Sequence, residues 1–62
     1  MTENEINEMA IETARLHTLE TIETVIRAIL GECKGAIEVL DAQEKPSYQI
    51  LKRAAKIKRQ AA

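Results

Sequence analysis

The chain has almost none of the residues that usually reinforce a small protein. Its 62 residues include a single cysteine, Cys33, and a single histidine, His17. One thiol cannot form a disulfide within the chain, and these two side chains cannot complete the four-ligand set of a structural zinc site. A chain of this length buries only about 60% of the surface of its unfolded form, so its own core is small. We therefore expect association with a second copy or with another protein, and a reducing cytoplasm as the location.

The groups needed for catalysis, cofactor binding or membrane insertion are also missing. His17 and Glu20 stand at helical spacing, which is more typical of an ordinary surface pair than of a metal site. Gly31 and Gly35 do not form a phosphate-binding loop, because no strand precedes them and no Lys-Ser or Lys-Thr follows. No apolar run approaches the roughly 20 residues of a membrane span, and residues 1–8 are acidic where a signal peptide is basic. These absences predict a soluble protein that is not an enzyme and that has no cofactor or metal.

What the chain does contain is a helical pattern of aliphatic residues. It is rich in Ala, Glu, Leu, Lys and Arg and has no alternating strand-like run. At helical spacing, one arc about half the circumference wide contains Leu16, Leu19, Ile22, Val25, Ile26, Ile29, Leu30, Cys33, Ala36, Ile37 and Leu40. This arc favours one long helix over about residues 5–43, with a possible kink near Gly31–Gly35. The two glycines leave a hairpin loop at that point as the alternative.

A clear break follows at Pro46, whose ring forbids continuation of a preceding helix. Pro46 in a first turn or Ser47 as a cap starts a second helix over about 47–60. The predicted fold is therefore all-α, a helical hairpin in a single domain of residues 1–62 that assembles into a helical bundle.

Charge is divided sharply between the two parts of the chain. Residues 1–44 contain all ten acidic residues and three basic ones, for a net charge of −7, whereas residues 45–62 contain six basic residues and no acid, for +6. The basic helix can pair with the acidic helix of the same chain or of a partner subunit. Alternatively, it can bind an acidic surface of another protein, a nucleic acid or a membrane surface.

Two groups of residues are candidates for contacts with other molecules. The basic face of the last helix is the predicted partner contact and consists of Lys52, Arg53, Lys56 and Arg59. The predicted oligomer core consists of Leu19, Ile22, Ile26, Ile29, Cys33, Ile37 and Leu40. We expect a non-enzymatic helical interaction protein that forms a homodimer or higher oligomer and modulates a partner protein. A nucleic-acid-binding regulator and a structural assembly factor are the alternatives.

The acidic opening Met1-Thr2-Glu3-Asn4-Glu5-Ile6-Asn7, the aliphatic helix and the basic tail together resemble the small accessory proteins of the early regions of lambda-like temperate bacteriophages. The resemblance covers size, composition and the order of charge along the chain. It rests on no sequence motif, so it assigns no functional role to any individual residue of this chain. It implies a helical regulator in the cytoplasm of the infected bacterium that docks on host or phage proteins.

Overall fold

Four helices account for most of the chain in the ranges that the structure, a computed structural model, describes, which are residues 1–31 and 35–61. They are α1 (Glu3–Leu16), α2 (Leu19–Leu30), α3 (Ala36–Asp41) and α4 (Pro46–Ala61). The prediction of an all-α fold is confirmed. None of these helices has the length and apolar composition required to cross a bilayer.

The first two helices each begin at a threonine cap. The Thr2 hydroxyl accepts a hydrogen bond from the Glu5 backbone N–H at 3.2 Å, and the Glu5 carboxylate accepts one from the Thr2 N–H at 3.3 Å. This reciprocal pair is a capping box. α1 ends at Leu16, His17 adopts an extended conformation, and the Thr18 hydroxyl then accepts from the Thr21 N–H at 3.1 Å to start α2.

The single long helix over residues 5–43 is wrong, because the chain turns twice within that span. The first turn is at His17 and Thr18, where the second cap competes successfully with helix continuation. The second lies between α2 and α3, where Gly31 and Gly35 both have positive φ, +81° and +68°. An uninterrupted α-helix requires negative φ throughout, so these backbone angles end α2 and set the start of α3.

The last helix agrees with its predicted limits. α4 has Pro46 as its first residue, a position that suits proline because the first N–H of a helix has no intrahelical partner. The Gln49 side-chain amide donates to the Gln43 carbonyl at 2.5 Å, which ties the start of α4 to the preceding loop. The hairpin topology is nevertheless replaced by a four-helix arrangement.

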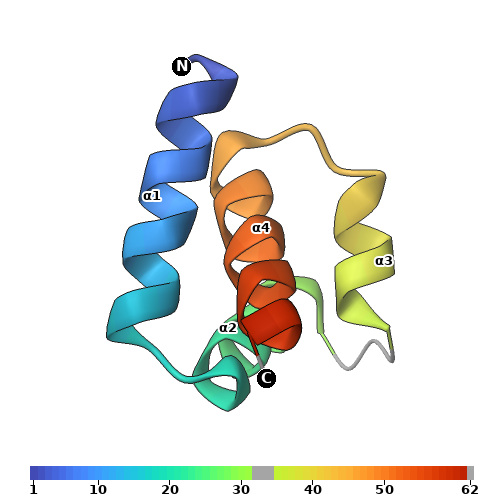
Figure 1. Cartoon of the computed structure of the whole chain (residues 1–62). Coiled ribbons are helices and arrows are strands. Elements are labelled where there is room, and N and C mark those ends of the chain that lie inside the picture. The colour runs from blue at the N-terminus through green and yellow to red at the C-terminus, as the bar shows by residue number, and fades with distance from the viewer. Residues whose placement is uncertain (32–34, 62) are drawn as a thin grey trace.

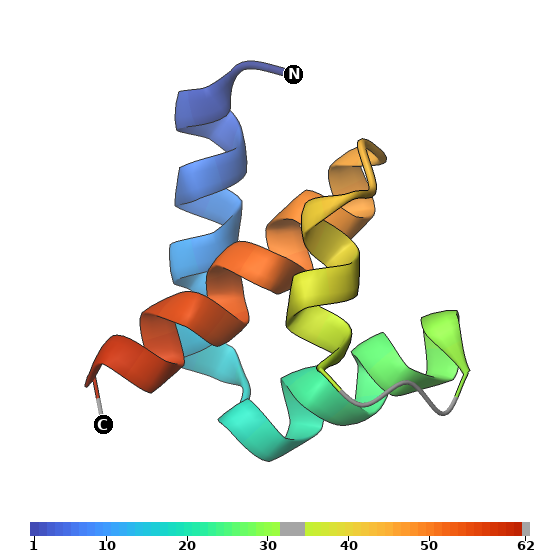
Figure 2. The same ribbon diagram turned by 90° about the vertical axis from the view of Figure 1, so that its right-hand side faces the viewer.

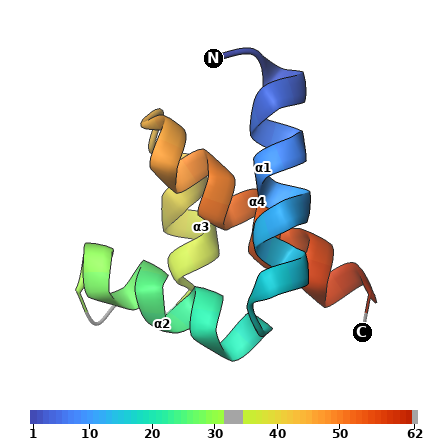
Figure 3. The ribbon, with the colours of Figure 1, turned by 90° about the vertical axis from the view of Figure 1, so that its left-hand side faces the viewer.

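α4 occupies the centre of this arrangement. It contacts α1, α2 and α3, and α2 also contacts α3. In Figure 1, α4 (orange to red) lies between α1 and α3. The two side views show α4 passing diagonally between these helices while α2 lies across the base (Figures 2 and 3). The most basic segment of the chain is therefore surrounded by the three acidic helices.

The core is small and contains both aliphatic and alanine side chains. Ile22 and Ile26 of α2 and Leu40 of α3 are its largest fully buried side chains. The other fully buried members are alanines of α1 and α4: Ala10, Ala54 and Ala55. Because the distance between packed helices depends on the side chains at the contact, these alanines allow α1 and α4 to approach closely.

Candidate functional site

The predicted contact face of α4 is largely occupied by ion pairs within the chain. Three of its four cations each pair with an acid on a different helix. The pairs are Lys52 with Asp41 of α3, Arg53 with Glu3 of α1, and Arg59 with Glu23 of α2. This pattern agrees with the interpretation that the basic helix packs on the acidic segment of the same chain.

Arg53 makes the most extensive of these contacts. One guanidinium nitrogen lies 3.0 Å from the Glu3 carboxylate, and another donates to the Asn7 side-chain oxygen. Exposed ion pairs each contribute only about 0–1 kcal/mol, so the three pairs orient the helices more than they stabilise them. They also reduce the positive charge that α4 can offer to phosphates.

Lys56 is the remaining member of the predicted contact face. It is exposed, and it has no salt bridge within residues 1–31 and 35–61. One exposed lysine is a much smaller basic surface than the four-residue face predicted from the sequence.

The predicted oligomer core is largely an intramolecular core. Ile22, Ile26 and Leu40 are fully covered by the chain itself and are not available to a second copy. Leu19 and Ile37 are partly buried and pack against the same cluster. Ile29 is the exception, with 41% of its surface exposed. The prediction for Cys33 lies outside the described residues.

A different surface, on the outer side of α1, combines charge with exposed apolar groups. Helical spacing of three or four residues places Glu5, Glu8, Met9, Glu12 and Leu16 on one side of the helix. We call these five residues the α1 outer face. Met9 is 43% exposed and Leu16 is 71% exposed. All three glutamates are exposed, and none of them forms a salt bridge among the residues that the structure describes.

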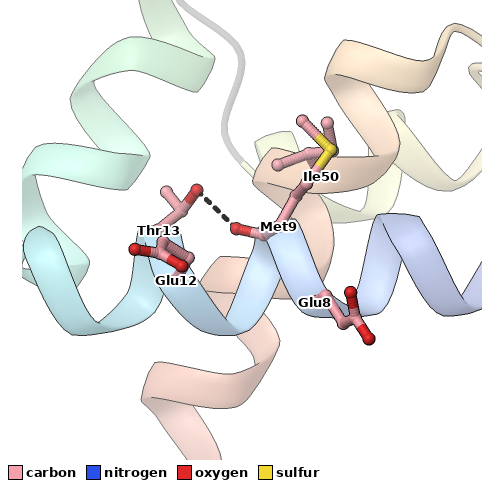
Figure 4. A pocket seen from close by; sticks show the side chains of 5 residues that line it. All are labelled: Glu8, Met9, Glu12, Thr13 and Ile50. Atoms are coloured by element: carbon pink, nitrogen blue, oxygen red, sulfur yellow. Dashed lines mark hydrogen bonds between the residues drawn. The ribbon is translucent and has the colours of Figure 1, made fainter.

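An open hollow lies beside this face, between α1 and α4. It has a volume of about 340 Å³ and is lined by Glu8, Met9, Glu12 and Thr13 of α1 and by Ile50 of α4. Figure 4 shows the Met9 side chain extending toward Ile50, while Glu8 and Glu12 lie on either side of it along α1. The Thr13 hydroxyl donates to the Met9 carbonyl at 2.8 Å, so its proton is already used. The lining of the hollow therefore includes two neighbouring apolar side chains, Met9 and Ile50, and the carboxylates of Glu8 and Glu12.

The lining of the hollow combines apolar and charged side chains. In the described part of the chain, no three His, Cys, Asp or Glu side chains come together as a metal site would require. The hollow contains carboxylates but no nucleophile paired with a base, which acyl-transfer chemistry needs. A surface that combines apolar and charged side chains in this way is typical of protein interfaces.

Comparison of the chain with protein-family models, with curated proteins and with solved structures returned no match.

Sequence reasoning missed the α1 outer face for a reason that the fold makes plain. Leu16 fell on the long apolar arc and was expected to face the core, whereas Met9 fell outside that arc. Once α1 ends at Leu16, the two residues belong to a separate helix whose buried side contains Ala10 and Ala14. The signal that could have shown this is Thr18, a good cap residue placed directly before an apolar helical pattern.

Proposed function

We propose that the protein is a non-enzymatic helical interaction protein that binds and modulates a partner protein. The observation that supports this proposal is the number of large apolar side chains that the fold leaves uncovered. Within residues 1–31 and 35–61, six of them are more than two-fifths exposed: Met1, Met9, Ile11, Leu16, Val25 and Ile29. In a chain with so small a core, a large part of the apolar surface of each of these residues stays uncovered.

The arrangement of these residues supports the proposal more than their number does. Single apolar residues scattered over a surface are normal, whereas contiguous ones mark interaction sites. Met9 and Leu16 are seven residues apart on one side of α1, and Val25 and Ile29 are four residues apart on α2. Each pair therefore forms a short apolar ridge on a helix surface, which is a common element of helix-mediated recognition.

The proposal includes self-association, and the structure changes the residues that would mediate it. Val25 and Ile29 are exposed on α2, and Thr21 and Ala28 on the same side are small and exposed. A second copy can approach α2 closely at these positions. Sedimentation should then show a mass that rises with concentration and falls in a Val25→Ser variant. A well-folded monomer up to high micromolar concentration would refute this part of the proposal.

From the resemblance noted above, we expect the partner among host or phage proteins of a bacterial cytoplasm. The test is affinity capture from a nuclease-treated bacterial lysate, with the intact chain and a Leu16→Ser/Val25→Ser variant as baits. Both substituted residues are exposed, so the variant should fold. A protein retained by the intact chain, lost from the variant and bound again in purified form would support the proposal.

A Gln60→Ser variant is the matched control, because Gln60 is exposed and belongs to α4, whereas the two ridges belong to α1 and α2. It should retain the same protein as the intact chain. If the intact chain retains material from an untreated lysate but none from the nuclease-treated one, the nucleic-acid alternative is favoured. If no protein distinguishes the intact chain from the double variant, the proposed function is wrong.

A further inference from the structure

We propose that the α1 outer face and the adjoining hollow bind a basic amphipathic helix of a partner protein. This inference rests on the proposed function and specifies the chemistry of the partner. It is based on the placement of Met9 beside Ile50 at the junction of α1 and α4, with Glu8 and Glu12 on either side of Met9 along α1.

The negative charge of the α1 outer face predicts that the partner's binding surface is positively charged. The cations of α4 pair with Glu3, Glu23 and Asp41, and these pairs leave the carboxylates of the α1 outer face without a salt bridge among the described residues. Arg15, which is exposed at the border of the face, reduces the local charge of the three glutamates from −3 to −2. A surface of this kind attracts Lys and Arg side chains and repels phosphate groups and anionic lipids.

The apolar residues determine the spacing of the partner's anchors. Met9 and Leu16 are seven residues apart, or about 10.5 Å along the axis of α1 at 1.5 Å per residue. A helix with apolar residues at positions i and i+7 presents two anchors at the same separation. Its intervening Lys or Arg residues then lie within reach of Glu8 and Glu12.

The backbone of α1 excludes recognition by strand addition. An extended peptide gains affinity from unpaired backbone N–H and C=O groups at a sheet edge. The backbone groups of α1 are already bonded along the helix. Recognition must therefore use side chains, as it does when a helix lies in a groove. The volume of about 340 Å³ is near the lower limit for small-molecule pockets and suits one or two apolar side chains.

A second copy of this chain does not fit the same description. Its only basic segment is residues 45–62, where Tyr48, Leu51 and Ile57 pack against its own core and Ile50 lines the hollow itself. Three of the cations of this segment are also paired within the chain. The occupant is thus a different protein, one whose basic helix keeps its apolar side available.

The test uses a defined probe, a fluorescein-labelled helical peptide of Leu, Ala and Lys with Leu on one side and Lys on the other. There are two control peptides. In one, every Lys is replaced by Glu, which reverses the charge, and in the other, every Leu is replaced by Ala, which removes the large apolar side chains. Fluorescence anisotropy with the full chain should show saturable binding of the first peptide alone. The affinity should also fall as salt is raised.

Matched variants then locate the site. Met9 and Ile11 are similarly exposed, at 43% and 46%, but lie on roughly opposite sides of α1. We expect Met9→Ser to weaken binding about fivefold or more because it removes an apolar contact, and Ile11→Ser to leave it unchanged. Likewise, Glu12→Gln should weaken binding, whereas Glu20→Gln, an equal loss of charge on α2, should have little effect. Circular dichroism of each variant verifies that it is folded.

Three results would overturn the inference. The first is that the Lys peptide binds no better than the Glu peptide. The second is that Ile11→Ser weakens binding as much as Met9→Ser does. The third is that sedimentation shows self-association that depends on Met9 and Glu12, because the molecule bound at this face would then be a second copy of the chain. None of these results would affect the capture experiment with Leu16 and Val25, so failure of this inference remains distinct from failure of the proposed function.

Discussion

Replacing Gly31 by alanine distinguishes the observed fold from a continuous helix by the sign of its effect on stability. Gly31 has φ +81° and ψ −166°, a combination that is essentially restricted to glycine. No heavy atom lies within 4 Å of the position that a Cβ would take. The cost of Gly31→Ala therefore arises from the backbone conformation alone and not from a steric clash.

The expected loss is about 2 kcal/mol of unfolding free energy, because a residue held in such a conformation costs about 1–3 kcal/mol. In a domain of this size that loss lowers the melting temperature by about 8–16 °C. Inside an uninterrupted helix the same substitution would instead stabilise the protein by about 1 kcal/mol, because alanine is the better helix former. Thermal and urea unfolding followed by far-UV circular dichroism measures the difference.

A synthetic chain with D-alanine at position 31 is the matched control. D-alanine adopts positive φ without strain and restricts the unfolded chain, so this variant should be as stable as the natural chain or about 0.4–1 kcal/mol more stable. If L-alanine stabilises the protein and D-alanine destabilises it, the turn after α2 does not exist, and the arrangement of α3 on α2 is wrong.

Three further predictions concern the packing around α4, and urea unfolding measures each of them. Ile26→Ala, which empties a fully buried site, should cost about 2–5 kcal/mol, and Ile29→Ala at a 41% exposed site about 1 kcal/mol or less; equal costs would contradict the assigned core. Arg53→Gln should cost about 0.5–1 kcal/mol at low salt and less at high salt because it removes contacts to α1, whereas Lys56→Gln should stay within about 0.5 kcal/mol of the natural chain. Ala54→Leu should cost about 1–3 kcal/mol, since the added methyl groups have no space in the core; a neutral result would show that the core there is loosely packed.

The parts of the fold that could be predicted from the sequence are those controlled by local chemistry. The helical class follows from composition and periodicity, the cap at Thr2 from its hydroxyl, and the start of α4 from the ring of Pro46. Each of these depends on a few neighbouring residues. Tertiary context is not needed to recognise them.

The long helix was predicted wrongly because periodicity has two interpretations. Ile26 and Leu40 share an arc if the helix is continuous, but they also share a core if the chain turns and α3 packs back on α2. The pattern of apolar residues is the same in both cases. The positive φ of Gly31 and Gly35, which decides between them, is a property of the folded backbone that the sequence permits but does not require.

The candidate site was predictable only in outline. The division of charge indicated that the basic helix would meet acidic residues, and three ion pairs of α4 agree with that interpretation. The identity of each partner depends on how three separate helices are placed around α4, which no spacing along the chain reveals. The α1 outer face was missed for the same reason, since it is the side of α1 that this placement leaves uncovered.

The central position of α4 has a consequence for how the protein is made. A ribosome synthesises α1, α2 and α3 before it reaches the segment on which all three pack. Until residues 46–61 leave the exit tunnel, the apolar sides of the earlier helices have no common surface to cover them. The four-helix packing is therefore completed only after α4 has been translated and has left the tunnel.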